Sequence, residues 1–152
     1  SSDVCSSDLA DAAGNVWHRS GDVGHLDAAG RLWIEGRVVH VIHSDRGPLT
    51  PVPVEVAVER LEGIDRCAAV GVGPLGCQQL VVVVEDAHGT DGLADDDVAR
   101  RVRGEVNEAL AAVLSVRALP VDIRHNTKID RTALAVWASA VLAGEKASQP
   151  WR

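Results

Sequence analysis

Phenylalanine, tyrosine and methionine are absent from this sequence, and its four tryptophans are the only aromatic side chains apart from histidine. Hydrophobic residues still make up 46% of the 152 positions, so valine, leucine and alanine must fill most of the core. No apolar run approaches the roughly 20 residues that a helix needs to cross a bilayer, and we expect no membrane span. The length suits one domain, or one domain with part of a second.

Positive charge is also scarce. The formal net charge is -7 at pH 7 and the pI is about 5.2. Sequence-independent binding to nucleic acid needs a basic surface, so we expect no nucleic-acid partner. The three cysteines (Cys5, Cys67 and Cys77) form no CxxC pair and leave one unpaired, which indicates a reducing, cytoplasmic location. We interpret Cys67 and Cys77 as small buried hydrophobic residues rather than nucleophiles.

The first nine residues, SSDVCSSDL, lack the charged and apolar regions of a signal peptide. They resemble the conceptual translation of a common sequencing-library adapter. We therefore interpret residues 1–9 as an assembly artefact and treat Cys5 as a non-functional thiol. On this interpretation the natural protein extends upstream of residue 10.

Turn residues and hydrophobic periodicity divide the remaining chain into short strands and three helices. The predicted strands are 16–19, 31–36, 37–43, 67–73, 79–85 and 118–123, and the predicted helices are 54–61, about 95–114 and 132–142. The longest helix is predicted because valine and leucine recur at helical spacing after Asp95-Asp96-Asp97. Four consecutive valines, 81–84, indicate a strand buried on both faces. This order of elements predicts an α+β fold, with helices packed on a small mixed sheet.

Three polar residues suggest a binding site. Asp22 follows a Ser-Gly turn, where a free carboxylate can accept hydrogen bonds from the vicinal hydroxyls of a ribose. Arg37 follows Gly36, where the backbone can approach a ligand closely and a guanidinium can reach phosphate oxygens. Lys128 lies between a predicted strand end and a helix start. On residue type alone, ordinary turn residues and a solvated loop lysine explain these positions better.

Metal ligation has less support. His40 and His43 are three residues apart, which places them on opposite faces of a strand, and no cluster of cysteines or carboxylates is nearby. We predict no metal site in this chain.

The motif order alters the interpretation of the three polar residues. W-x-R-S-G-D, then D-x-x-G-R-L-x-I-x-G-R, then a distant K-I-D-R resembles the C-terminal third of adenylate-forming enzymes, from about Trp17 to Val141. This family includes acyl-CoA synthetases, fatty acyl-AMP ligases, nonribosomal-peptide adenylation domains and luciferases. The resemblance implies a small C-terminal domain with a short mixed sheet flanked by about three helices, preceded by β-hairpins from the end of a large domain. The implied boundaries are 10–36 for that end, 37–144 for the small domain and 145–152 for a loose tail.

The resemblance also implies roles for the site residues. Asp22 would bind the ribose hydroxyls of ATP and acyl-AMP, and Arg37 would contact the nucleotide next to the hinge between the two domains. Lys128 would be catalytic, bridging the substrate carboxylate, the α-phosphate and the ribose ring oxygen. A compact ammonium suits this place because a carboxylate must attack a phosphate, and both groups are anionic. ATP and Mg²⁺ are the implied cofactors, with the metal held mainly by the upstream domain and the phosphates.

Departures from the family pattern point to one branch. Thr127 stands where the family usually has glycine, and Val39 stands at the hinge position, usually Asp or Lys. HSDRGPLTPVPVE replaces the lysine-glycine segment that shapes the pantetheine tunnel of CoA-using members. His125 and Asn126 could position Lys128 or the substrate, although simple loop hydrogen bonding explains them equally well.

These features resemble the olefin β-lactone synthetases, a branch close to the fatty acyl-AMP ligases. Its members activate a 3-hydroxy fatty acid as the acyl-AMP, and the substrate's own hydroxyl then closes a β-lactone. The implied partners are a fatty or 3-hydroxy fatty acid and other olefin-biosynthesis enzymes. Two alternatives stay open: a fatty acyl-CoA synthetase that forms AMP, and a non-catalytic α+β interaction module. We expect this chain alone to be inactive.

Overall fold

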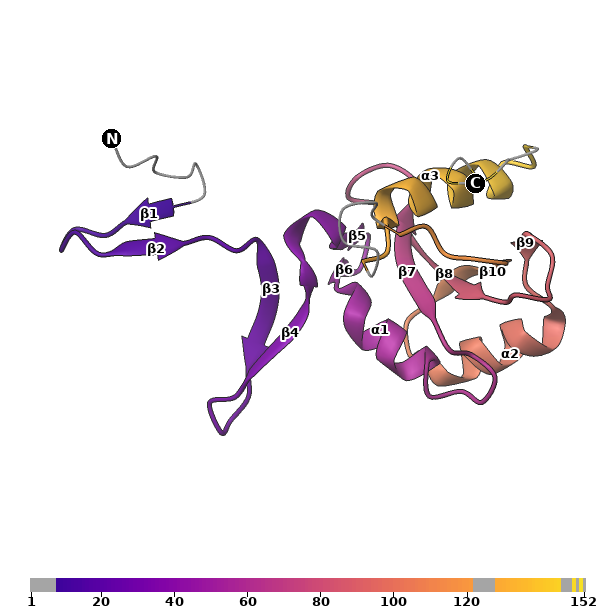
Figure 1. The fold of residues 1–152 in the computed structure, drawn as a ribbon, viewed down its shortest axis with the longest axis horizontal. Coiled ribbons are helices and arrows are strands. Elements are labelled where there is room, and N and C mark those ends of the chain that lie inside the picture. The colour runs from indigo at the N-terminus through magenta and orange to yellow at the C-terminus, as the bar shows by residue number, and fades with distance from the viewer. Residues whose placement is uncertain (1–7, 122–127, 146–148, 150, 152) are drawn as a thin grey trace.

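Two antiparallel hairpins precede an α+β body in the computed structural model, which describes residues 8–121, 128–145, 149 and 151. The first hairpin pairs β1 (Asp8–Ala10) with β2 (Val16–His18), and the second pairs β3 (Asp22–Leu26) with β4 (Leu32–Arg37). Both extend away from the body (Figure 1). Strand β3 was not predicted from the sequence, because its residues follow a turn and are mostly exposed.

The turns of the two hairpins have the same sequence pattern and the same hydrogen bonds. Residues 11–17 read DAAGNVW and residues 27–33 read DAAGRLW. The carboxylate of Asp11 accepts hydrogen bonds from the backbone N–H of Asn15 and the indole N–H of Trp17, and Asp27 does the same from Arg31 and Trp33. Hydrogen bonds from Asn15 to Asp11, and from Trp33 and Arg31 to Asp27, lower the pKa of each carboxyl to about 2.

The body is built on a four-stranded mixed sheet with the order β7-β8-β10-β9. Its strands are β7 (Cys67–Val72), β8 (Gln79–Glu85), β9 (Gly92–Leu93) and β10 (Leu110–Val116). Strands β8 and β10 run parallel, and the other pairs are antiparallel. A small hairpin of β5 (Ile42–Ser44) and β6 (Gly47–Leu49) leads into helix α1 (Pro51–Val58), and α2 (Asp96–Glu105) and α3 (Arg131–Leu142) complete the body.

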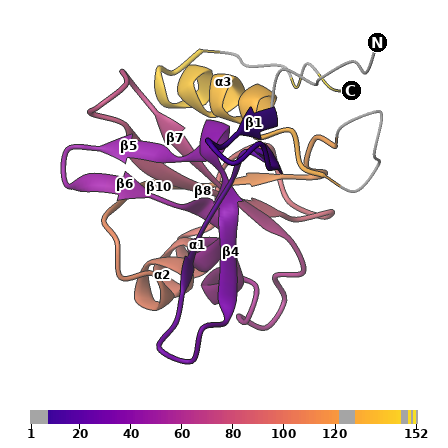
Figure 2. The same cartoon turned by 90° about the vertical axis from the view of Figure 1, so that its left-hand side faces the viewer.

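Helices cover both faces of this sheet, with α3 on one face and α1 and α2 on the other (Figures 1 and 2). The valines of β8 alternate between two cores. Val82 and Val84 pack against α1 and α2, whereas Val81 and Val83 pack against α3. All four are at most 2% exposed, so the predicted burial on both faces is confirmed.

The predicted helix 95–114 is wrong in its second half. Helix α2 ends at Glu105, Val106 is already extended, and Leu110–Val116 forms the strand β10 beside β8. This strand is buried on both faces and is therefore almost continuously apolar, so helical spacing occurs in it by chance.

The predicted strand 37–43 is also wrong. Arg37 ends β4, residues Val38–His40 form a short 3₁₀-helix (η1), and only Ile42 and His43 belong to β5. The side chains of Val38 and Val39 are exposed, because η1 turns the chain from the second hairpin into the body. β-branched residues favour strands only where a neighbouring strand edge is available.

The predicted burial of the cysteines is right for one of them. Cys67 is buried in β7, and burial raises the pKa of its thiol. Cys77 is exposed in the turn between β7 and β8, so its prediction as a buried residue is wrong. No helix in the described ranges is both long and apolar enough to cross a membrane.

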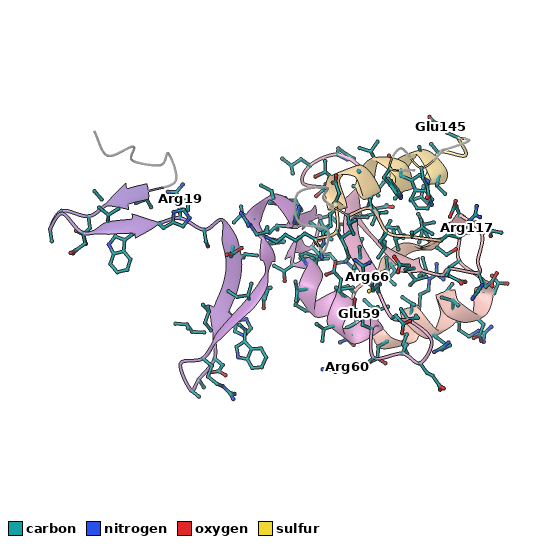
Figure 3. The ribbon with its side chains drawn as sticks, viewed as in Figure 1. Arg19, Glu59, Arg60, Arg66, Arg117 and Glu145 are labelled. Atoms are coloured by element: carbon teal, nitrogen blue, oxygen red, sulfur yellow. The ribbon has the colours of Figure 1, made fainter. Side chains whose placement is uncertain are left out.

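Helix α1 closes the free edge of β7, the outermost strand on its side of the sheet. Glu55 lies on α1, and Glu59 is the C-cap residue that follows the helix, four positions later. The N–H of Ala69 donates to Glu55 Oε1 at 2.9 Å, and the N–H of Cys67 donates to Glu59 at 3.3 Å. Glu59 extends from the end of α1 beside the start of β7 (Figure 3). These N–H groups have no strand partner, so the two carboxylates satisfy donors that burial would otherwise leave unpaired.

Candidate functional site

A cavity of about 700 Å³ lies between the second hairpin and the start of α3. Its walls come from β3, β4, η1, the start of α1 and the segment that precedes α3. Asp22, Arg37 and Lys128 all line it, and Val39 does so as well. The fold therefore brings together the three principal candidates from the sequence, which come from three separate segments of the chain.

Asp22 and Arg37 form an ion pair at the edge of this cavity. They are directly opposite in the β3–β4 register, and Arg37 Nε lies 3.2 Å from Asp22 Oδ1. Gly21 has φ +76, and a Cβ there would lie 3.3 Å from the Arg37 guanidinium. The turn is closed by a hydrogen bond from the Asp22 N–H to Ser20 Oγ. The Ser-Gly-Asp sequence thus leaves room for Arg37 and aims the carboxylate at it.

The candidate hinge residue, Val39, comes two positions after Arg37 in the chain. Gly36 has φ +140, and a Cβ there would lie 3.1 Å from Pro51 at the start of α1. The Val38 N–H donates to the carbonyl of Gly21, which ties η1 back to the second hairpin. Val39 is 82% exposed and lines the cavity, so its side chain does not hold the connection in place.

The backbone that follows Lys128 is held by two contacts, although the Lys128 side chain is exposed. Ile129 forms an antiparallel bridge with Val121, and the Asp130 N–H donates to the carbonyl of Pro120. The Asp130 carboxylate caps the N-terminus of α3. No hydrogen bond or ion pair engages the Lys128 ammonium within the described part of the chain. His125, Asn126 and Thr127 lie outside the described residues.

Three further residues of the site were not assigned a role from the sequence. Arg131, at the first position of α3, lines the cavity and donates two hydrogen bonds to Glu55 of α1. Glu55 is 76 residues away, so no local pattern indicated the pair. His40 lines the same cavity, and its pKa is lowered by burial first and then by the charges of Arg131 and Arg37.

Metal ligands do not cluster here. Residues 8–121, 128–145, 149 and 151 contain no group of three or more His, Cys, Asp or Glu side chains that could hold a metal ion.

Comparison with known proteins shows clear relatives, although no protein-family model matches the chain. An olefin beta-lactone synthetase of Stenotrophomonas maltophilia is 46% identical over 137 residues, covering 88% of this chain and 25% of the relative. A long-chain-fatty-acid–CoA ligase of Mycobacterium tuberculosis is 32% identical over 62 residues, covering 41% of this chain and 12% of that protein. The chain spans about a quarter of the length of the first of these relatives.

The solved structure of ATP-bound MatB from Rhodopseudomonas palustris superimposes with a TM-score of 0.67 at 19% identity. The superposition covers 86% of this chain and 26% of MatB. The fold is that of the small C-terminal domain of adenylate-forming enzymes. The predicted α+β class, with a short mixed sheet and about three helices, is confirmed for the described residues.

Proposed function

We propose that this chain is the C-terminal region of an ATP-dependent ligase that forms acyl-adenylates. The observation that carries the proposal is that Asp22, Arg37 and Lys128 line one cavity of about 700 Å³. That volume lies within the usual range for small-molecule sites, roughly 300–1,000 Å³. The 46% identity to an olefin beta-lactone synthetase supports the same conclusion.

In the adenylation step, a carboxylate oxygen of the acid attacks the α-phosphorus of ATP. The bond from that phosphorus to the bridging oxygen breaks, and pyrophosphate leaves with the electron pair. The Lys128 ammonium lies between the two anions, reduces their repulsion and stabilises the charge that develops on the phosphoryl oxygens. The chain has only two lysines, at 128 and 146, among 15 basic residues. Lys128 thus offers a compact point charge, whereas most other basic residues of the chain are arginines with a planar guanidinium.

Asp22 and Arg37 hold the nucleotide. Arg37 Nε lies 3.2 Å from Asp22 Oδ1. A carboxylate has about four acceptor sites, so Asp22 can still accept hydrogen bonds from two vicinal ribose hydroxyls. Arg37 then orients the carboxylate and presents its remaining donors to the nucleotide.

The second half-reaction forms a β-lactone. The 3-hydroxyl oxygen attacks the acyl carbonyl carbon, the bond from that carbon to the AMP oxygen breaks, and AMP leaves with the electron pair. The hydroxyl proton passes to solvent. The match to the β-lactone synthetase over 88% of the chain, against 41% for the CoA ligase, supports this outcome over transfer to CoA. A 3-hydroxy fatty acid is the substrate class.

Two chimeric enzymes test the proposal. In each, residues 10–145 replace the aligned segment of a relative, either the Stenotrophomonas β-lactone synthetase or the mycobacterial CoA ligase. We expect both to catalyse ATP–pyrophosphate exchange, and both to lose it in the Lys128→Ala variant. The first should convert a 3-hydroxy fatty acid into lactone without CoA, and the second should accumulate acyl-AMP without forming thioester.

The outcomes separate the alternatives. Thioester formation by the second chimera, at the rate of the parent CoA ligase, would favour a fatty acyl-CoA synthetase. Absence of exchange in both chimeras, with the fold intact by circular dichroism, would favour a non-catalytic interaction module.

A further inference from the structure

One buried ion pair joins three elements of the body next to the cavity. Arg131 Nε donates to Glu55 Oε1 at 3.0 Å, and an Arg131 terminal nitrogen donates to Oε2 at 2.6 Å. Oε1 also accepts the N–H of Ala69 in β7 at 2.9 Å. The Arg131 side chain is 18% exposed and that of Glu55 is 9% exposed. The pair thus fixes the start of α3 to both α1 and β7.

The two parallel hydrogen bonds constrain orientation as well as distance. A bidentate pair holds the guanidinium in the plane of the carboxylate, which a single point contact cannot do. Burying an ion pair is costly, and apolar residues of similar volume often stabilise a fold as well or better. The arrangement is therefore better explained by a need to fix the first turn of α3 than by stability alone.

Lys128 is three residues before Arg131 and forms no hydrogen bond or ion pair within the described residues. Its position depends on what holds the segment that follows. The Ile129 bridge and the Asp130 hydrogen bond join this segment to Val121 and Pro120, which are close to it in the sequence. The Arg131–Glu55 pair ties the start of α3 to α1, 76 residues away, alongside the packing of α3 on β7.

The pairing of charges around the cavity also connects Glu55 and Arg131 with Lys128. Three cations line it, namely Arg37, Lys128 and Arg131. Arg37 is paired with Asp22, and Arg131 is paired with Glu55. In the part of the chain that the structure describes, Lys128 is the cation of this cavity without an ion pair. Glu55 therefore also prevents Arg131 from competing with Lys128 for anionic groups.

We infer that Glu55 and Arg131 form a positioning pair that presents the Lys128 ammonium to the carboxylate and phosphate of the substrates. Neither residue needs to touch a substrate for this role. The inference rests on the proposed function, because it assigns the pair a task only if Lys128 acts in adenylation.

The first test measures backbone order at Lys128 in the 152-residue chain. Backbone ¹⁵N relaxation at Lys128 is compared between the wild type, Arg131→Lys and Glu55→Gln. Arg131→Lys keeps the charge but loses the bidentate geometry, and Glu55→Gln keeps an acceptor for Ala69 but loses the charge. We expect the order parameter at Lys128 to fall from about 0.85 to below about 0.6 in both variants, while residues around Trp137 keep theirs. An unchanged order parameter in a folded variant would overturn the inference.

The second test measures catalysis in the β-lactone synthetase chimera. A displacement of about 1 Å can cost on the order of 100-fold in rate, so we expect kcat for adenylation to fall about 10- to 100-fold in both variants. KM for the acid should change less than about twofold, because substrate binding does not involve the pair. A purely structural role would lower the amount of folded enzyme without this split between kcat and KM.

Arg66→Lys is the matched control. It makes the same change in the partly buried pair of Arg66 with Glu85, whose N–O distance is 3.6 Å, and Arg66 does not line the cavity. We expect wild-type kcat and wild-type order at Lys128 in this variant. If Lys128→Ala leaves adenylation intact, the proposed function fails. If Lys128→Ala abolishes it while Arg131→Lys and Glu55→Gln keep wild-type kcat, only the positioning inference fails.

Discussion

Replacing the buried Glu55 of α1 by alanine should destabilise the fold more than replacing the exposed Glu59 that follows this helix. The variant leaves the Arg131 guanidinium, 18% exposed, without its carboxylate. It also leaves the Ala69 N–H without the acceptor that lies at 2.9 Å in the native structure. Removing one partner from a buried pair costs about 3–5 kcal/mol, and water that reaches the partly exposed guanidinium reduces this. We expect a loss of about 3 kcal/mol, the unpaired N–H included.

Glu59→Ala supplies the matched control for this change. Glu59 is the C-cap residue of the same helix and accepts from the N–H of Cys67 at 3.3 Å. It is exposed and forms no ion pair among the described residues. We expect a loss of about 1 kcal/mol or less.

Urea unfolding followed by tryptophan fluorescence measures both losses, because Trp137 of α3 is buried in the core between this helix and the sheet. In the double variant Glu55→Ala/Arg131→Ala, part of the loss should be recovered, since no unpaired charge remains. Equal losses in Glu55→Ala and Glu59→Ala, or strict additivity in the double variant, would refute the reasoning from the ion pair.

The remaining predictions concern single side chains. Lys128→Ala should leave the urea midpoint unchanged, because the side chain is exposed, while pyrophosphate exchange in the chimera falls at least about 100-fold. The lowered pKa of His40 means that the unfolded state takes up a proton first, so stability is lost as pH falls from about 6.5 towards the folded pKa. His40→Gln should remove that part of the pH dependence, measured by urea midpoints at about pH 5 and pH 7.5. Gly24→Ala should disrupt the second hairpin, since a Cβ there would clash with the Trp33 backbone carbonyl oxygen, and the Trp33 indole N–H resonance should shift. Gly104→Ala, in α2 with nothing within 4 Å of its Cβ position, should instead stabilise by about 0.5–1 kcal/mol in the same urea assay.

Local patterns predicted those elements whose periodicity matches one burial state. Helix α3 and strand β8 were predicted almost to the residue, because an amphipathic stripe and a run of four valines each have one interpretation. Strand β10 was mistaken for helix because burial on both faces removes the alternation that distinguishes a strand. Whether Leu110–Val116 is strand or helix is decided by the open edge of β8 beside it, and a local pattern does not contain that information.

The site, like the fold, was predicted from the sequence only where local motifs carry the information. Motif order was enough to nominate Asp22, Arg37 and Lys128, which the fold places around one cavity. The partners of these residues could not be predicted, because pairs such as Glu55 with Arg131 form only when distant elements pack. The matched DAAGxxW turns at 11–17 and 27–33 were visible in the sequence, but their meaning depends on hydrogen bonds from backbone and indole to one carboxylate.

The carboxylates that close the edge of β7 also bear on self-association. An exposed strand edge is a template for pairing with another copy, and natural sheets protect such edges with charge, short strands or covering elements. Here α1 covers one edge with Glu55 and Glu59, and β9 at the opposite edge is only two residues long. The same glutamate that fixes Arg131 thus also keeps a valine-rich sheet from growing by addition of further chains. A variant lacking both carboxylates would expose the edge of β7, and we expect its folded protein to aggregate through this strand.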